Sequence, residues 1–217
     1  VYKRQFYASF GYTTCQEGRA MGPVLGRLAE AANRGLLAVD IVAYPDILGA
    51  ADQLGGALHQ RGYRNRLRIG GAKISLDGSP QGKTAWLTRP YHVPPAGAAA
   101  DYRGLQTAPT GATMEAVSRC YERGWQILVH AGGDAAIDLM IAAVREATRR
   151  HGPGARRPVL IHGQTLREDQ VDQVRELGIF PALFPMHTFY WGDWHRDSVL
   201  GPARAENISP TGWLMSR

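Results

Sequence analysis

Two consecutive segments of this chain repeat one design, in which an almost fully apolar strand ends in a histidine and is followed by an amphipathic helix. The two units cover residues 125–150 and 157–177, and their strands end at His130 and His162. Strands that are apolar on both faces are typical of parallel sheets covered by helices. The repeat therefore predicts an α/β fold assembled from strand–helix units.

About six such units follow one another in the 217 residues. The other predicted strands cover residues 6–15, 36–43, the segment around Lys73, and 179–186. Of the other three predicted helices, the first has Pro23 in its first turn and the next two are capped by Asp46 and Thr113. They end at Gly35, Gly62 and Gly124, respectively. A complete barrel has eight units in about 250 residues, and no strand is followed by the Gly-x-Gly-x-x-Gly turn of a dinucleotide-binding sheet. The prediction is an α/β fold of the incomplete (β/α)8 TIM-type barrel class.

The composition fits a globular protein and argues against several other classes. Apolar residues make up 44% of the chain and charged residues 20%, and no apolar run approaches the ~18 residues of a membrane span. The net charge is +6, but the basic residues are spread over helix faces and loops, so no nucleic-acid partner is expected. The two cysteines form neither a metal spacing nor a disulfide framework, and the first residues do not resemble a signal peptide. We expect a cytoplasmic protein, without a membrane partner, that acts on a small-molecule substrate.

Lys73 stands in an apolar strand of a chain that has 22 arginines and only three lysines. A lysine in a buried strand is costly unless it is paired or neutral. A primary amine, unlike a guanidinium, loses its proton readily when buried and can then take part in covalent chemistry. The alternative is an interior lysine that pairs with Asp77 or extends its amine to solvent. This stretch alone favours that alternative.

Lys73, His130, His162 and His187 are all predicted at the carboxyl ends of different strands, which face one common mouth in a barrel. A single histidine after an apolar strand is more often hydrogen-bonded to backbone. Two of them in consecutive units, with a lysine upstream, favour neutral imidazoles that converge on one ion. A neutral lysine can also add carbon dioxide, which gives an anionic oxygen ligand. The residues alone therefore favour a metal-dependent hydrolase over a structural barrel.

Several motifs occur in a fixed order between Gly11 and Gly212. They are residues 73–79 (Lys-Ile-Ser-Leu-Asp-Gly-Ser), 82–85 with 90–91, 129–138, 161–164, 185–188 with 191–194, and 200–205. Together these motifs resemble the amidohydrolase superfamily, and within it the YtcJ-like metal-dependent hydrolases of the amidohydrolase 3 type.

The resemblance implies a distorted (β/α)8 barrel that holds one or two divalent metal ions, most often zinc, at the strand mouths. Lys73, in carbamylated form, would be the fourth-strand ligand, and His130 and His162 would be the fifth- and sixth-strand ligands. A metal-activated water would attack a carbon–nitrogen bond other than a peptide bond, in an amide or a cyclic amide. These three residues are therefore the expected catalytic and metal-binding residues.

Four other residues are assigned by the same resemblance. Asp77, Ser79 and His187 would lie near the substrate. Asp134 would orient the neighbouring histidine ligand or cap the next helix.

Two parts of the family pattern are not found in the sequence: the first-strand His-x-His pair and the eighth-strand aspartate. Residues 1–5, when back-translated, resemble the transposon-end DNA of sequencing libraries, so we interpret them as a non-native scar from a metagenomic read. Residues 6–217 are then a partial barrel domain with a long loop insertion at residues 78–111. We expect this fragment to be inactive by itself, and its full-length parent is compatible with a homo-oligomer.

Two other interpretations stay open at this point. A metal-free barrel enzyme would form a Schiff base on Lys73, and borohydride would trap that imine. A non-catalytic, barrel-derived binding protein would use His130 and His162 as structural hydrogen-bonding groups and would hold no stoichiometric zinc.

Overall fold

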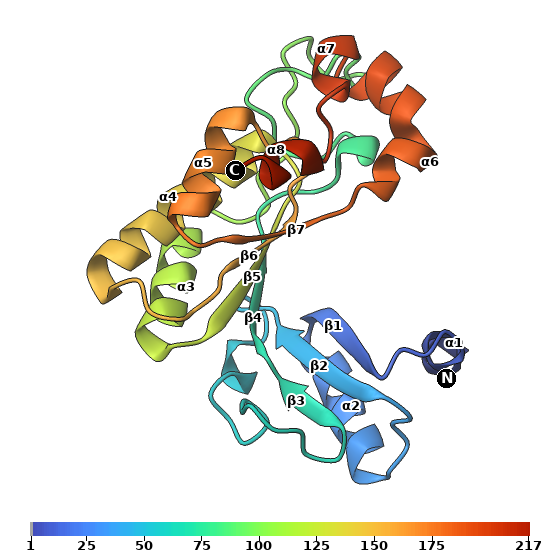
Figure 1. Ribbon diagram of the computed structural model, residues 1–217, viewed down its shortest axis with the longest axis vertical. Helices are drawn as coiled ribbons and strands as arrows, with labels where there is room; N and C mark the ends of the chain where they lie inside the picture. Colours follow the sequence, from blue (N-terminus) through green and yellow to red (C-terminus); the bar gives the residue numbers. More distant parts are fainter. Residues whose placement is uncertain (1) are drawn as a thin grey trace. The chain divides into compact units, whose positions relative to one another are not determined.

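The computed structural model describes residues 2–217, with side chains from Phe6 onward, and the chain divides into two compact units. Unit 1 comprises Val1–Ile74 and Trp125–Leu128, and unit 2 comprises Ser75–Gly124 and Val129–Arg217. Strands and helices alternate along the chain except at β3 and β4, which follow each other directly. The strands form two sheets with the orders β1-β2-β3 and β4-β5-β6-β7 (Figure 1). Within the described residues, no helix combines the length and the apolar character needed to cross a membrane.

Unit 1 is built around the first sheet. Its elements are α1 (Tyr2–Ser9), β1 (Thr14–Ala20), α2 (Gly22–Asn33), β2 (Asp40–Pro45), the short 3-10 helix η1 (Ala51–Gln53) and β3 (Leu67–Ile69). Strand β2 pairs in parallel with β1 on one side and with β3 on the other. Helix α2 ends at Asn33, and the predicted stop Gly35 follows its C-cap, with a φ of +66° in the left-handed region that glycine adopts without steric cost.

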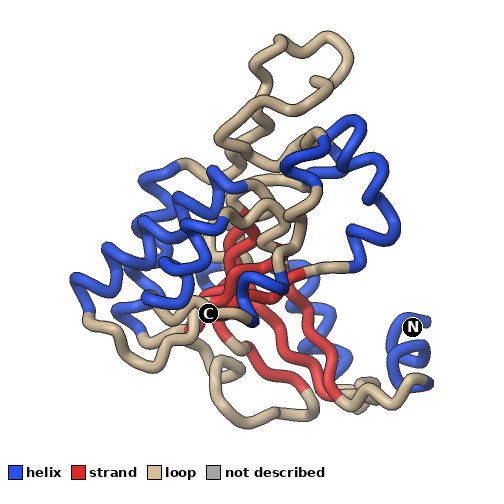
Figure 2. The backbone as a smooth tube through the Cα atoms, turned by 45° about the horizontal axis from the view of Figure 1, so that its top comes forward, coloured by secondary structure: helices blue, strands red, loops and turns tan. Residues whose placement is uncertain are grey.

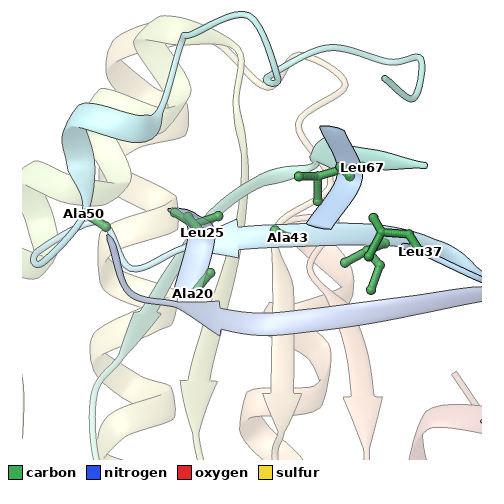
Figure 3. Close-up of a cluster of buried hydrophobic side chains, with 8 residues drawn as sticks. Ala20, Leu25, Leu37, Ala43, Ala50 and Leu67 are labelled. Atoms are coloured by element: carbon green, nitrogen blue, oxygen red, sulfur yellow. The ribbon is translucent and has the colours of Figure 1, made fainter. Parts of the chain in front are cut away.

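The apolar face of α2 packs with buried residues of the first sheet. The buried cluster consists of Ala20, Leu25, Ala32, Leu37, Ile41, Ala43, Ala50 and Leu67 (Figure 3). Most of the β2 residues are buried, which explains the apolar run that predicts this strand. The hydrophobic effect of this cluster is the main stabilising contribution that the structure shows for unit 1.

Replacing Leu67 with alanine is expected to lower the free energy of unfolding by about 2–4 kcal/mol, because the side chain is almost fully buried in this cluster. Chemical denaturation measures the change. Leu48 is 51% exposed, so Leu48→Ala is the matched control and should change the free energy by less than about 0.5 kcal/mol. Equal effects of the two substitutions would contradict the packing described for β3.

The prediction of a strand over residues 6–15 is wrong. This stretch instead contains the end of α1 and the start of β1. The rings of Phe6 and Phe10 lie 5.0 Å apart, the contact expected of side chains four positions apart on a helical turn. The residues of β1 are mostly polar and partly exposed, so the strand lacks the apolar pattern that reveals β2. Of the residues interpreted as a scar, Val1 lies outside the described residues, and the backbone of residues 2–5 belongs to α1.

The predicted helix after Asp46 is also absent, and the described chain has only η1 in that region. The Asp46 carboxylate does cap a turn, because its Oδ1 accepts the N–H groups of Leu48 and Gly49, each at 3.0 Å. Glycines at positions 49, 55 and 56 then follow within one short stretch. Each glycine costs a helix about 1 kcal/mol relative to alanine, which offsets the cap.

Unit 2 contains most of the second sheet. Strands β4 (Gly71–Ser75) and β5 (Gln126–Ala131) have residues in both units. The other elements are η2 (Pro80–Gly82), α3 (Thr110–Arg123), α4 (Asp134–His151), β6 (Val159–His162), α5 (Glu168–Glu176), β7 (Phe180–Leu183), α6 (Met186–Trp194), the π-helix η3 (His195–Val199), α7 (Pro202–Ala205) and α8 (Thr211–Met215). Strand β6 pairs in parallel with β7, with His162 opposite Leu183. Helices α3, α4 and α5 form a row of neighbours (Figures 1 and 2).

Most boundaries in unit 2 lie close to their predicted positions. Helix α3 begins at Thr110 rather than at Thr113, whose hydroxyl donates to the Pro109 carbonyl from within the helix. The long loop from residue 78 to residue 109 contains only η2. The last predicted strand is too long, because β7 ends at Leu183 and α6 begins three residues later. His187 therefore lies in the first turn of a helix and not at a strand end.

Candidate active site

The side chains of His130 and His162 lie next to each other at the ends of β5 and β6. Their ring centroids are 4.7 Å apart, and the ring planes meet at 75°. Both residues are partly exposed, and their strands are neighbours in the sheet. The two strand–helix units thus place equivalent histidines in direct ring contact.

His130 is oriented by the loop that follows β4. Its Nε2 lies 2.9 Å from the carbonyl oxygen of Gly78 and 3.5 Å from Oδ1 of Asp77. A carbonyl oxygen only accepts hydrogen bonds, so Nε2 carries the proton in the neutral ring, and Nδ1 carries the lone pair. Histidines that bind metals in proteins typically donate their other ring N–H to a carbonyl or a carboxylate in this way.

Asp77 holds the turn that follows His130. Its buried carboxylate accepts the backbone N–H groups of Gly132 at 2.9 Å, Gly133 at 2.7 Å and Trp86 at 3.0 Å. Three N–H donors stabilise the ionised form of a buried carboxylate. The geometry therefore gives Asp77 a positioning role beside His130, and its predicted contact with substrate stays a prediction.

His162 has a backbone conformation that is unusual for a residue with a side chain. Its φ is +76°, and the next residue, Gly163, has a φ of +52°. A non-glycine residue in this region costs of the order of 1 kcal/mol, and such conformations cluster at functional sites. The turn is held by the Gly163 N–H, which donates to Ala131 at the end of β5.

Lys73 is the middle residue of β4 and is only 5% exposed. Its carbonyl accepts the N–H of Ile47 at 2.8 Å, and its backbone forms an isolated bridge with Asp46. Lys73 belongs to unit 1, whereas His130 and His162 belong to unit 2. The structure brings the two histidines together, and the participation of Lys73 stays a prediction.

Ser79 lies in the loop before η2, and Asp134 lies at the start of α4, four residues after His130. The N–H of Ser79 donates to the Thr84 hydroxyl at 3.0 Å, which closes the tight turn around η2. Asp134 is the first residue of α4, and its carboxylate accepts hydrogen bonds from the backbone and the hydroxyl of Thr88. It also forms an ion pair with Arg167 at 3.3 Å. These contacts tie the start of α4 to Thr88 and Arg167, but the carboxylate does not cap the helix, whose N-cap is Gly133.

A pair of buried histidines lies near this site, and one member was not predicted. His187 is 4% exposed and His195 is fully buried, and their Nδ1 and Nε2 atoms lie 3.4 Å apart. The ring of Phe184 stands between His162, at 6.3 Å, and His187, at 4.9 Å. No local sequence pattern identifies His195 as a buried residue. His195 lies in the π-helical turn η3, and no sequence motif predicts such a turn.

The buried pair should make unit 2 sensitive to acid. Burial lowers the pKa of His187, and burial together with the nearby His187 lowers the pKa of His195 to about 4. The unfolded chain therefore binds more protons than the folded chain below the ordinary histidine pKa of about 6.5. Stability from this pair is complete above about pH 6.5 and is lost as the pH falls towards 4, by roughly 2 kcal/mol.

Urea denaturation at several pH values tests this expectation. The His195→Gln variant should show a flatter dependence between pH 6.5 and 4 than the unsubstituted chain, because it lacks the buried imidazole. His151, which bonds Ser118 at the far end of α4, provides the matched control His151→Gln. Parallel pH profiles for all three proteins would contradict the attribution of the acid sensitivity to the buried histidine pair.

The donor set fits part of a metal site. Two imidazoles in contact at the ends of neighbouring strands are typical nitrogen ligands for zinc. Among residues 6–217, whose side chains are described, no group of three or more His, Cys, Asp or Glu residues is placed to hold a metal ion. A metal at the His130 and His162 rings would therefore need further ligands from other groups.

Comparison with known proteins decides the family. The model of the amidohydrolase family matches residues 5–217. The chain belongs to the amidohydrolase family. Its family membership confirms the relationship expected from the motifs around Lys73, His130 and His162.

Individual relatives agree with this family. The Bacillus subtilis (strain 168) protein YtcJ, named as an amidohydrolase, is 28% identical over 119 residues, which is 55% of this chain and 21% of YtcJ. A metal-dependent hydrolase of Pyrococcus furiosus is 25% identical, with a TM-score of 0.78 over 98% of this chain and 42% of that protein. A metal-dependent hydrolase of Pyrococcus horikoshii OT3 is 21% identical, with a TM-score of 0.78 over 98% of this chain and 41% of that protein.

These likenesses also settle the fold class. The parallel sheets and the strand–helix alternation are those of the amidohydrolase barrel, and the strands form two sheets rather than one closed barrel. The chain spans less than half of the length of the two solved hydrolases. The prediction of an incomplete (β/α)8 barrel is confirmed.

Proposed function

We propose that this amidohydrolase-family chain is part of a metal-dependent hydrolase that acts on carbon–nitrogen bonds other than peptide bonds, in amides or cyclic amides. The observation that carries the proposal is the contact between His130 and His162, with the Nε2 proton of His130 held by the Gly78 carbonyl. A structural histidine needs no partner imidazole at the next strand end. Two neighbouring imidazoles, one with a fixed tautomer, are what a metal site requires.

His130, through Nδ1, and His162 are the proposed metal ligands, and zinc is the proposed metal. Lys73 is proposed as a third ligand after its neutral amine adds carbon dioxide, which releases a proton and leaves a carbamate oxygen. When bound, such a metal supplies a water of lowered pKa and polarises the scissile carbonyl. Family membership and the metal-dependent hydrolases among the structural relatives support a divalent metal.

The other residues have two proposed roles: some hold backbone segments of the site in place, and others lie close to the substrate. Asp77 keeps the turn after β5 in place through its three backbone N–H bonds, so that His130 keeps one orientation. Ser79 and His187 are proposed to lie close to the substrate. Asp134 holds the start of α4 against Thr88 and Arg167, which positions the segment after His130.

We also propose that the remaining ligands come from parts of the longer protein outside this span. The support is that the chain covers 42% of its structural relative from Pyrococcus furiosus. The 217 residues alone should then show no hydrolysis.

The complete protein tests the proposal. It should hydrolyse simple amides or cyclic amides, lose this activity after dialysis against a chelator, and regain it with zinc. A series that includes hydantoin-type rings, N-acyl amines and a dipeptide separates the bond types. Activity that persists without metal, or that is restricted to the dipeptide, would refute the proposal.

A further inference from the structure

A separate cavity in unit 2 is not used by the proposed chemistry. It has a volume of about 210 Å³ and lies between the starts of α4 and α5, the loop at residues 87–89, and helices α7 and α8. Its walls combine apolar side chains with charged groups. All of its lining residues belong to unit 2.

The charged groups of the cavity are three arginines and two carboxylates. Both carboxylates already have arginine partners, because Asp134 pairs with Arg167 and Glu168 pairs with Arg217 at 2.7 Å. Arg167 also forms a bidentate pair with Asp138. The remaining positive charges at the cavity are those of the other two arginines.

Arg204 and Arg89 are these two arginines. Arg204 donates from Nε to the Leu200 carbonyl at 2.7 Å and from Nη2 to the Pro90 carbonyl at 2.8 Å, which fixes its position without neutralising its charge. Burial lowers the pKa of Arg204, and the charge of Arg89 lowers it further, while Asp134 opposes the shift. Arg89 has no hydrogen bond or ion pair to any described residue. Two arginines of like charge therefore line one cavity, and an anion between their guanidinium groups would be stabilised.

The two helices add to the positive potential. Asp134 begins α4 and Glu168 begins α5, so the positive ends of both helix dipoles lie at the cavity wall. The backbone N–H groups at such ends favour negative charge. The dipoles act in the same direction as the arginine pair.

The rest of the wall is apolar, which argues for an organic anion over phosphate. Leu87, Leu166, Leu200 and Trp213 form this part. An apolar cavity of about 150 Å³ accepts a benzene molecule, so 210 Å³ is enough for a ring and one carboxylate.

We propose that this cavity binds a small aromatic or branched carboxylate, with the carboxylate between Arg89 and Arg204 and the hydrocarbon part against Leu166 and Trp213. The cavity is distinct from the contact between His130 and His162. The inference does not depend on the hydrolytic function, and it holds or fails for the 217-residue chain as it stands.

Isothermal titration calorimetry of the chain with sodium benzoate tests the proposal. Benzoate should bind with one site per chain. Benzamide, which has the same shape without the charge, and inorganic phosphate, which has charge without the ring, should each bind at least about tenfold more weakly.

Two substitutions locate the site. The Arg89 side chain is exposed, so Arg89→Gln should leave folding intact. The substitution should nevertheless weaken benzoate binding by about tenfold. Arg123→Gln, at the exposed end of α3, is the matched control and should leave the affinity unchanged. Trp213→Ala should weaken the binding of benzoate, and benzoate should still bind more tightly than benzamide.

Three outcomes would overturn the proposal. They are the absence of benzoate binding, equal binding of benzoate and benzamide, and benzoate binding that Arg89→Gln does not weaken. A failure of any of these tests leaves the metal-dependent hydrolysis untouched, because that activity is measured separately on the complete protein.

Discussion

Substitution of His130 or His162 by alanine in the complete protein is expected to lower kcat/KM for an amide substrate by about 1,000-fold or more. Groups that only orient a metal ligand change activity or affinity by 10–100-fold, so removal of a ligand itself should exceed that range. The two rings lie in contact, at a centroid separation of 4.7 Å, so each substitution removes one of the two proposed nitrogen ligands. Steady-state kinetics with added zinc at several concentrations measures the loss.

A control separates this effect from general damage. His151→Ala removes an imidazole that bonds only Ser118 at the end of α4, and it should retain almost full activity. The thermal midpoints of the three variants should remain within a few degrees of one another. If His130→Ala and His162→Ala retained more than a tenth of the activity, the two histidines would be structural and the non-catalytic interpretation would be favoured.

Asp77→Ala is expected to be the most destabilising single substitution near the site. The buried carboxylate accepts three backbone N–H groups, and its removal leaves all three without their partner. An unsatisfied buried donor costs about 1–3 kcal/mol, so the free energy of unfolding should fall by about 4 kcal/mol. Urea denaturation of the 217-residue chain measures this change.

Two further variants show whether the loss of stability comes from the Asp77 carboxylate. Asp77→Asn keeps one oxygen acceptor but removes the charge. Its free energy of unfolding should therefore fall by less than that of Asp77→Ala. Asp101→Ala changes an exposed aspartate in the long loop and should alter the free energy by less than about 0.5 kcal/mol. A loss below 1 kcal/mol for Asp77→Ala would show that the turn after β5 does not depend on the carboxylate.

The repeated strand–helix units were predictable because their signals are local. Residues 125–130 and 157–162 are apolar over a whole strand, and β5 and β6 lie within one or two residues of these positions. Strand β1 was missed because it is polar and partly exposed, and the helix after Asp46 failed because glycines offset a good cap. In both cases the local pattern used for the prediction was misleading: β1 has no apolar pattern, and the glycines after Asp46 outweigh its capping signal.

The candidate site could be predicted only in part for a similar reason. The pairing of His130 with His162 follows from consecutive strand ends, and the sequence contains both. The contact that fixes the His130 tautomer joins residues 52 positions apart, and the bond from Asp77 to Gly132 joins residues 55 apart. His195 reaches His187 only because a π-helical turn buries it. Hydrogen bonds between residues more than 50 positions apart have no periodic signal in the sequence.

The most direct test of the central claim is a crystal structure of the complete, zinc-loaded protein with data collected at the zinc absorption edge. We predict an anomalous peak between the two rings, about 2.0–2.1 Å from Nδ1 of His130 and from a nitrogen of His162. The Nε2 of His130 should still donate to the carbonyl of Gly78. The absence of a peak at these rings in an active, zinc-dependent enzyme, or a peak on Nε2 of His130, would contradict the account.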